Sequence, residues 1–103
     1  GTALAYLAQG GNGCISVTAN VAPKLCSEMH KSWRLGDIKK AQEINLKLAL
    51  LHNVLFLESS PGPVKYAAHL MKLCNQDTRL PLYEISDNTK KEVENCLKNL
   101  NLI

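Results

Sequence analysis

The fold is decided by one short stretch of sequence, Gly10-Gly11-Asn12-Gly13-Cys14-Ile15-Ser16-Val17-Thr18-Ala19-Asn20-Val21. A glycine-rich turn precedes a mostly apolar run over residues 13–18, which predicts a short strand buried on both faces, as in parallel sheets. We expect Asn20 to cap the helix that follows, with Pro23 in its first turn. A strand followed directly by a helix is typical of α/β proteins.

The remaining sequence predicts helices and no second strand. A lone strand leaves its backbone N–H and C=O groups without partners, so it needs neighbouring strands from a sheet. The chain therefore resembles the end of an α/β barrel or open sheet, continued by a helical extension. The expected helices cover residues 2–8, 21–35, 38–57, 63 to about 74, and a final helix capped by Ser86 or Asp87.

The long helix expected over residues 38–57 has two apolar faces, which is typical of a helix buried on several sides or placed at an interface. Asp37 is its expected N-cap, and Gly36 ends the helix before it. The first face consists of Ile38, Ala41, Ile44, Leu48, Leu51 and Leu55. The second face consists of Leu46, Leu50, Val54 and Leu57.

Composition narrows the class of protein. The chain has 103 residues, 46% hydrophobic content and a net charge of +3, which fits one small globular domain. The basic pairs Lys39-Lys40 and Lys90-Lys91 are each followed by acidic residues, and no basic stripe carries aromatic side chains, so nucleic-acid binding is not expected. No signal peptide or membrane span is predicted, and we expect a reducing cytoplasm.

The cysteines and histidines do not predict a metal or cofactor site. Four cysteines occur without a CxxC pair, and their spacing fits no zinc template. We expect Cys14, Cys26 and Cys96 to be buried apolar residues. His30, His52 and His69 have no carboxylate or cysteine at ligand spacing, so they are expected to be partly exposed helix residues.

Two basic residues are candidates for catalysis, but their surroundings in the sequence favour structural roles. Lys65 stands at a helix start with nothing nearby to lower its pKa, so we expect it to pair with a carboxylate elsewhere. Arg79 precedes Leu80-Pro81-Leu82 and is expected to pack or to form an ion pair. No triad of nucleophile, base and acid is indicated.

Chemistry in parallel barrels occurs at the C-terminal ends of the strands, which here points to residues 15–20. These residues would form a pocket wall of backbone and small polar side chains. The alternative is an ordinary buried strand with Asn20 as a helix cap. The glycines at 10–13 precede the strand, so they predict a turn and not a phosphate-binding loop.

The same residues resemble a known family. The stretch over residues 10–21 is similar to the eighth-strand segment of the dihydrodipicolinate synthase family. Leu51-His52-Asn53-Val54-Leu55-Phe56, Glu58-Ser59-Ser60-Pro61-Gly62-Pro63-Val64-Lys65 and Arg79-Leu80-Pro81-Leu82 resemble later segments of that family in the same order. The resemblance covers the whole chain.

The resemblance implies a (β/α)₈ barrel with a three-helix C-terminal extension. Residues 1–36 would be the end of the barrel and residues 37–103 the extension. The implied reaction condenses pyruvate with aspartate semialdehyde through a lysine Schiff base, in the diaminopimelate branch of lysine biosynthesis. Members of the family are usually cytoplasmic homotetramers.

A full barrel needs about 250 residues, so the chain looks like roughly the last third of such an enzyme. The resemblance places the Schiff-base lysine outside this sequence, and Lys65 does not replace it, so the chain alone is expected to be inactive. Ile15 is the one site residue that carries over, with its backbone beside bound pyruvate. Two alternatives stay open: a related pyruvate-dependent lyase such as N-acetylneuraminate lyase, or a non-catalytic helical module that binds through Leu46, Leu50 and Val54.

Overall fold

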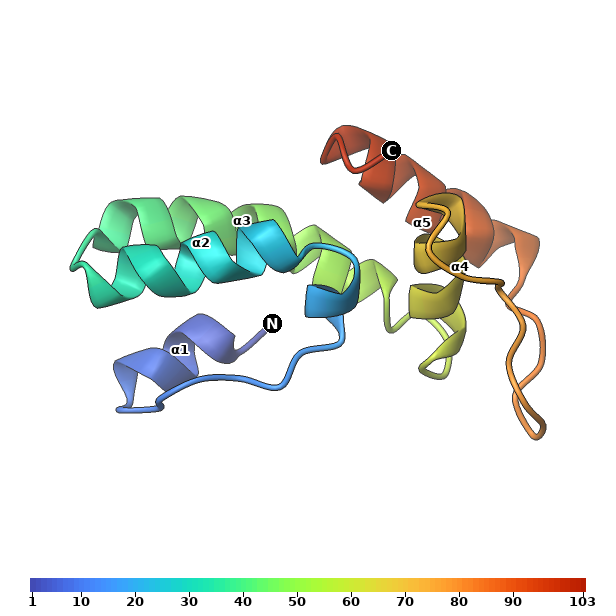
Figure 1. Cartoon of the computed structure of the whole chain (residues 1–103), viewed down its shortest axis with the longest axis horizontal. Helices are drawn as coiled ribbons and strands as arrows, with labels where there is room; N and C mark the ends of the chain where they lie inside the picture. Colours follow the sequence, from blue (N-terminus) through green and yellow to red (C-terminus); the bar gives the residue numbers. More distant parts are fainter.

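A computed structural model describes residues 1–103 as five α-helices and one short 3₁₀-helix. Helices α2 and α3 form an antiparallel pair, α1 lies along this pair, and α4 and α5 pack at its other end (Figure 1). Both terminal residues, Gly1 and Ile103, are exposed. The elements are α1 (Ala3–Ala8), η1 (Thr18–Asn20), α2 (Pro23–Arg34), α3 (Ile38–Val54), α4 (Gly62–Leu70) and α5 (Asp87–Asn99).

Local signals set most of the helix ends, as predicted. The Asp37 side chain accepts a hydrogen bond from the Lys40 N–H (3.1 Å) and caps α3. Gly36 follows α2 with a φ of +77°, a conformation that favours glycine. Ser86, and not Asp87, caps α5, and its hydroxyl accepts from the Thr89 N–H (3.3 Å).

Asn20 does not cap α2, so this prediction was wrong. It is the last residue of η1, and its amide Nδ2 donates to the Val17 carbonyl (3.0 Å). The chain needs a further turn before α2, and Ala22 takes the N-cap position without a side-chain hydrogen bond. Pro23 opens the helix as expected, because its missing N–H costs nothing in the first turn.

The structure contains no β-strand, which corrects the prediction of a strand over residues 13–18. Residues 11–16 form an irregular connection that is drawn as a gently curving loop, and residues 18–20 form η1 (Figure 1). The backbone N–H and C=O groups of residues 12–16 make no hydrogen bond within the chain. A strand exists only as part of a ladder, and these 103 residues supply no second strand to form one.

The core is organised around one face of α3. Ile44, Leu48, Leu51 and Leu55 are at most 5% exposed and form a cluster with residues of α2, α4 and α5. This confirms the first predicted face, apart from Ile38, which is 42% exposed at the helix start. The other members of the cluster are Val21, Ala22, Met29, Val64, Ala67, Val93, Cys96 and Leu97.

The second face of α3 is mostly open to solvent. Leu46 is 70% exposed and Leu50 is 62% exposed, whereas Val54 is half-buried. The helix ends at Val54, three residues earlier than predicted, and Leu57 lies beyond it in the connection to α4. An apolar helix face without a partner in the chain is a surface that further structure can cover.

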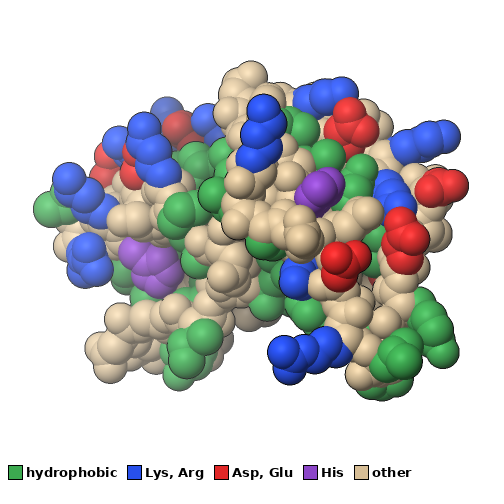
Figure 2. Space-filling model, turned by 45° about the vertical axis from the view of Figure 1, so that its right-hand side comes forward, with side chains coloured by type: hydrophobic (Ala, Val, Ile, Leu, Met, Phe, Trp, Pro, Cys, Tyr) green, Lys and Arg blue, Asp and Glu red, His purple; other side chains and the backbone are tan.

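The overall dimensions are those of an elongated body. Its extents are 42 × 27 × 21 Å, and its radius of gyration is 14.2 Å, against about 13 Å for a compact domain of 100 residues. Acidic and basic side chains are interspersed over the face shown in Figure 2, with apolar side chains between them. None of the helices is both long and apolar enough to cross a membrane.

Candidate functional site

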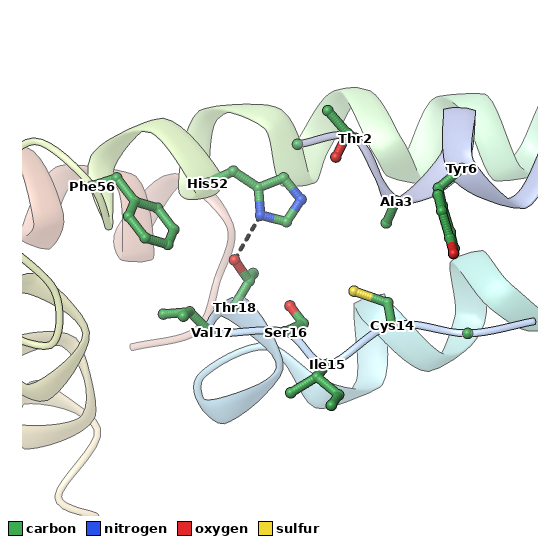
Figure 3. A pocket seen from close by; sticks show the side chains of 12 residues that line it. Thr2, Ala3, Tyr6, Cys14, Ile15, Ser16, Val17, Thr18, His52 and Phe56 are labelled. Atoms are coloured by element: carbon green, nitrogen blue, oxygen red, sulfur yellow. Dashed lines mark hydrogen bonds between the residues drawn. The ribbon is translucent and has the colours of Figure 1, made fainter. Parts of the chain in front are cut away.

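The candidate site is a cavity of about 380 Å³ beside residues 13–18, the predicted strand, whose C-terminal end was predicted to carry the chemistry. Three parts of the chain form its wall: the start of α1, residues 13–18, and the C-terminal half of α3 (Figure 3). Ala3 and Tyr6 come from α1, His52 comes from α3, and Phe56 comes from the connection that follows α3. No lysine, arginine or carboxylate lines it.

Residues 14–16 retain the alternation of an extended chain. The side chains of Cys14 and Ser16 point toward α3, whereas that of Ile15 points to the opposite side (Figure 3). The Ile15 side chain is fully exposed, and its backbone N–H and C=O have no partner. This segment therefore offers free backbone donors and acceptors together with one uncovered apolar side chain.

Two local hydrogen bonds shape the turn after this segment. The Ser16 hydroxyl accepts from the Ala19 N–H (3.3 Å), and the Asn20 amide donates to the Val17 carbonyl (3.0 Å). Both bonds close within three residues, as is usual for small polar side chains in turns. They determine the shape of the turn but not its place relative to the helices.

A third hydrogen bond connects the turn to α3. The Thr18 hydroxyl and the His52 Nδ1 lie 2.6 Å apart, and these residues are separated by 34 positions in the sequence. Thr18 is only 1% exposed, and its side chain points directly at the imidazole (Figure 3). The pair closes one end of the cavity between the segment and α3.

The environment of His52 favours its uncharged form. Burial lowers the pKa of His52 below its ordinary value of 6.5, and the positive charge of the N-terminus lowers it further. A neutral imidazole offers one acceptor and one donor nitrogen. It suits a fixed hydrogen bond with a buried hydroxyl better than a charged ring would.

The sequence contained a signal for His52 that the prediction did not use. Leu48, Leu51, His52 and Leu55 follow the i, i+3, i+4, i+7 spacing of one helix face, so the histidine lies at the edge of the core stripe. A half-buried polar group at such a position needs a partner. The identity of that partner, Thr18, could not be read from local sequence.

The cysteines differ in part from the prediction. Cys96 is buried and Cys26 is half-buried, but Cys14 is exposed, because no strand covers the segment that carries it. Burial raises the pKa of the Cys26 thiol, and the neighbouring Cys14 adds to the effect. Burial likewise raises the pKa of Cys96. All four thiols are free, and no group of three potential ligands is placed to hold a metal ion.

The two basic residues considered in the sequence lie elsewhere. Lys65 and Arg79 border a separate open hollow of about 600 Å³ near the start of α4. Neither forms an ion pair; the two ion pairs join Lys90 to Glu84 and Lys98 to Glu94. The expected carboxylate partner of Lys65 is therefore absent, and Arg79 is exposed, not packed.

The cavity can bind and orient a small polar molecule, but its wall lacks the lysine that the family's Schiff-base chemistry requires. Its wall provides backbone groups, the hydroxyls of Thr2, Ser16 and Thr18, and an uncharged imidazole. It contains no lysine that could form the Schiff base of the family's reaction and no carboxylate that could activate a hydroxyl.

Comparison with protein families identifies relatives of the chain. Residues 1–100 match the model of the dihydrodipicolinate synthetase family. The chain is 49% identical over 102 residues to the 4-hydroxy-tetrahydrodipicolinate synthase of Acidiphilium cryptum and 45% identical over 103 residues to that of Gluconacetobacter diazotrophicus. These alignments cover 99% and 100% of this chain but 35% of each relative.

Solved structures agree with this comparison. Dihydrodipicolinate synthase of Thermotoga maritima aligns over 99% of this chain with a TM-score of 0.97 and 38% identity. The enzyme of Acinetobacter baumannii, solved in complex with pyruvate, aligns over 99% with a TM-score of 0.92 and 42% identity. In both cases the chain covers 35% of the longer protein. These relatives are (β/α)₈ barrels, and the chain corresponds to their C-terminal part.

Proposed function

The chain belongs to the dihydrodipicolinate synthetase family, and from this premise we propose that it is the C-terminal part of a 4-hydroxy-tetrahydrodipicolinate synthase. The reaction would condense pyruvate with aspartate semialdehyde through a lysine Schiff base, in the diaminopimelate branch of lysine biosynthesis. The chain spans about a third of the length of the curated relatives it matches, so the rest of the catalytic machinery would come from the part it does not span.

One observation supports the proposal that residues 13–18 pair with a neighbouring strand in the complete enzyme. The backbone of residues 12–16 makes no hydrogen bond within the chain, although the residues on both sides of it are held in place. Pairing with a neighbouring strand would satisfy these groups and cover the exposed Ile15 side chain. We propose that residues 13–18 are the last barrel strand and that the Ile15 backbone lies beside bound pyruvate.

The nucleophile would come from outside this chain. No lysine lines the cavity, and Lys65 borders a different hollow near the start of α4. The chain alone would therefore form no lysine Schiff base with pyruvate and would have no synthase activity. Incubation with pyruvate and borohydride, followed by mass spectrometry, checks this point: no lysine of the chain should be modified.

The proposed division of the chain follows from the same assignment. Residues 1–36 would complete the barrel, and residues 37–103 would form the helical extension, with α3 as its first helix. The uncovered side chains of Ile15, Leu46 and Leu50 support burial against further structure. A cytoplasmic homotetramer is the assembly proposed for the complete enzyme.

The experiment that tests this function replaces the C-terminal 35% of the Acidiphilium cryptum synthase with residues 1–103. The fused protein should condense pyruvate with aspartate semialdehyde, whereas the same host cut at the junction should not. A fused protein that folds but does not catalyse the condensation would contradict the proposal. The cleavage of N-acetylneuraminate, assayed in parallel, separates the synthase from the related lyase.

A helical interaction module is the second candidate, and the exposed Leu46 and Leu50 favour it. In that case the chain would pair through the second face of α3. Size-exclusion chromatography of the chain distinguishes the two functions: a stable dimer that Leu50→Gln converts to a monomer supports the module. An elution profile unaffected by Leu50→Gln supports the synthase.

A further inference from the structure

The hydrogen bond between Thr18 and His52 is the only one that ties the proposed strand segment to α3. Ser16 and Asn20 bond within the segment and its turn, and the Ser16 side chain also bonds to the Cys26 thiol of α2. The backbone bonds that end the turn, from Val21 and Ala22 to the Thr18 carbonyl, are also local. The position of the segment relative to α3 therefore depends on this single bond and on packing.

Both partners of this bond are held rigidly. Thr18 is 1% exposed and β-branched, so its χ1 angle has few alternatives. His52 follows Leu51 and precedes Leu55, and both leucines are fully buried in the core. These buried neighbours fix the position of the His52 backbone in the molecule.

We infer that His52 is a positioning residue, which acts through Thr18 to hold the Ile15 backbone in the orientation that binds pyruvate. This inference rests on the proposed function of the segment. Thr18 lies three residues after Ile15, and both line the same cavity, so a shift of the Thr18 hydroxyl changes the direction of the strand end. His52 touches no reacting atom in this arrangement; its effect passes through Thr18.

The role differs from that of a general base. No carboxylate lies in the cavity wall to orient or charge the imidazole, and its Nδ1 is already occupied by Thr18. A positioning role predicts a loss of substrate affinity with little loss of turnover, whereas a general base would mainly affect turnover.

The test uses the fused synthase described above and two pairs of variants. Thr18→Val removes the hydroxyl at constant shape, and Thr18→Ser keeps it. His52→Leu removes the ring nitrogen, and His52→Asn keeps a polar atom near the position of Nδ1. We expect Thr18→Val and His52→Leu to raise the KM for pyruvate about fivefold, which is the loss typical of one hydrogen bond, with kcat within about twofold of the parent.

The conservative variants should rescue the effect. Thr18→Ser and His52→Asn should return the KM for pyruvate to within about twofold of the parent value. An unchanged KM in Thr18→Val, in a fused protein that is itself active, would overturn the inference and leave the proposed function intact. Inactivity of the unaltered fused protein would instead contradict the proposed function.

A measurement on the 103-residue chain itself decides the structural half of the inference. Backbone ¹⁵N relaxation reports the order of residues 14–17 on the ps–ns timescale. We expect the order parameters of these residues to fall in Thr18→Val and to stay at the parent value in Thr18→Ser. Equal order parameters in both variants would show that the bond does not hold the segment, and the inference would fail whatever the kinetics.

Discussion

The Glu58 carboxylate accepts two hydrogen bonds from Ser86 at the start of α5. The Ser86 N–H and hydroxyl both point to the same oxygen, at 3.0 and 3.1 Å. The connection after α3 is thereby joined to the N-terminus of α5, which carries the positive end of the helix dipole. Hydrogen bonds from the Thr89 side chain and from the Ser86 backbone lower the pKa of Glu58 below its ordinary value of 4.5.

This contact predicts an acid-sensitive contribution to stability. Because the folded state lowers the pKa of Glu58, the stabilisation is complete above the ordinary pKa of 4.5 that the unfolded chain has, and it is lost as the pH falls through the folded value. Glu58→Gln should therefore flatten the fall in unfolding free energy between about pH 5 and pH 3. Urea unfolding at several pH values in this range measures the free energy of unfolding. An equally steep fall in Glu58→Gln would contradict a stabilising role for the Glu58 contact.

A second prediction compares a leucine of the hydrophobic core with an exposed leucine on the opposite face of α3. Leu48 is 1% exposed and Leu46 is 70% exposed. Leu48→Ala should lower the free energy of unfolding by about 2–5 kcal/mol, because it leaves a cavity in the core. Leu46→Ala, the matched control, should change it by less than about 0.5 kcal/mol in the isolated chain. Similar losses from both would mean that the second face is covered.

Much of the fold was predictable because helix ends depend on nearby residues. Asp37, Gly36 and Ser86 each act within four positions, and their sequence signals were sufficient. Asn20 was assigned wrongly, because η1 inserts a further turn between it and Pro23. A strand depends on a partner that may lie anywhere in the protein, so the pattern at residues 13–18 could not determine what these 103 residues form alone.

The candidate site was predictable only on one side. The residues of the segment were identified from their pattern, and Ile15 stays a prediction for the complete enzyme. The opposing wall comes from α1 and α3, and the pairing of Thr18 with His52 depends on how helices pack across 34 residues. No local pattern encodes a contact between residues so far apart in the sequence. The place of His52 at the edge of the core stripe indicates only that its imidazole needs a partner.

The pKa of His52 gives a third prediction. Burial lowers it below 6.5, so the folded state favours the neutral ring. The resulting stabilisation is complete above the unfolded pKa of about 6.5 and is lost as the pH falls through the folded value. An NMR titration of the ring protons should give a midpoint below 6.5. Acetylation of the N-terminus removes its positive charge, which is the lesser cause, so the midpoint should stay below 6.5. A midpoint above 6.5 would contradict the assignment of the lowered pKa to burial.

Two glycines near α1 form a matched pair for a fourth prediction. A Cβ at Gly11 would collide with the Tyr6 ring and lie 2.8 Å from the Tyr6 carbonyl oxygen, which accepts the Gly11 N–H. A Cβ at Gly13 would meet nothing within 4 Å. Gly11→Ala should destabilise the chain by about 1–3 kcal/mol, and Gly13→Ala should change stability by less than about 0.5 kcal/mol. Thermal unfolding of both variants compares them; a harmless Gly11→Ala would show that the turn shifts freely.

The central claim is that residues 13–18 become a strand and bring Ile15 to pyruvate once the barrel is complete. A crystal structure of the fused synthase with bound pyruvate measures both points at once. We predict ladder hydrogen bonds along these residues and an Ile15 backbone atom within about 4 Å of pyruvate. A segment that stays unpaired, or an Ile15 backbone remote from pyruvate, would contradict the account.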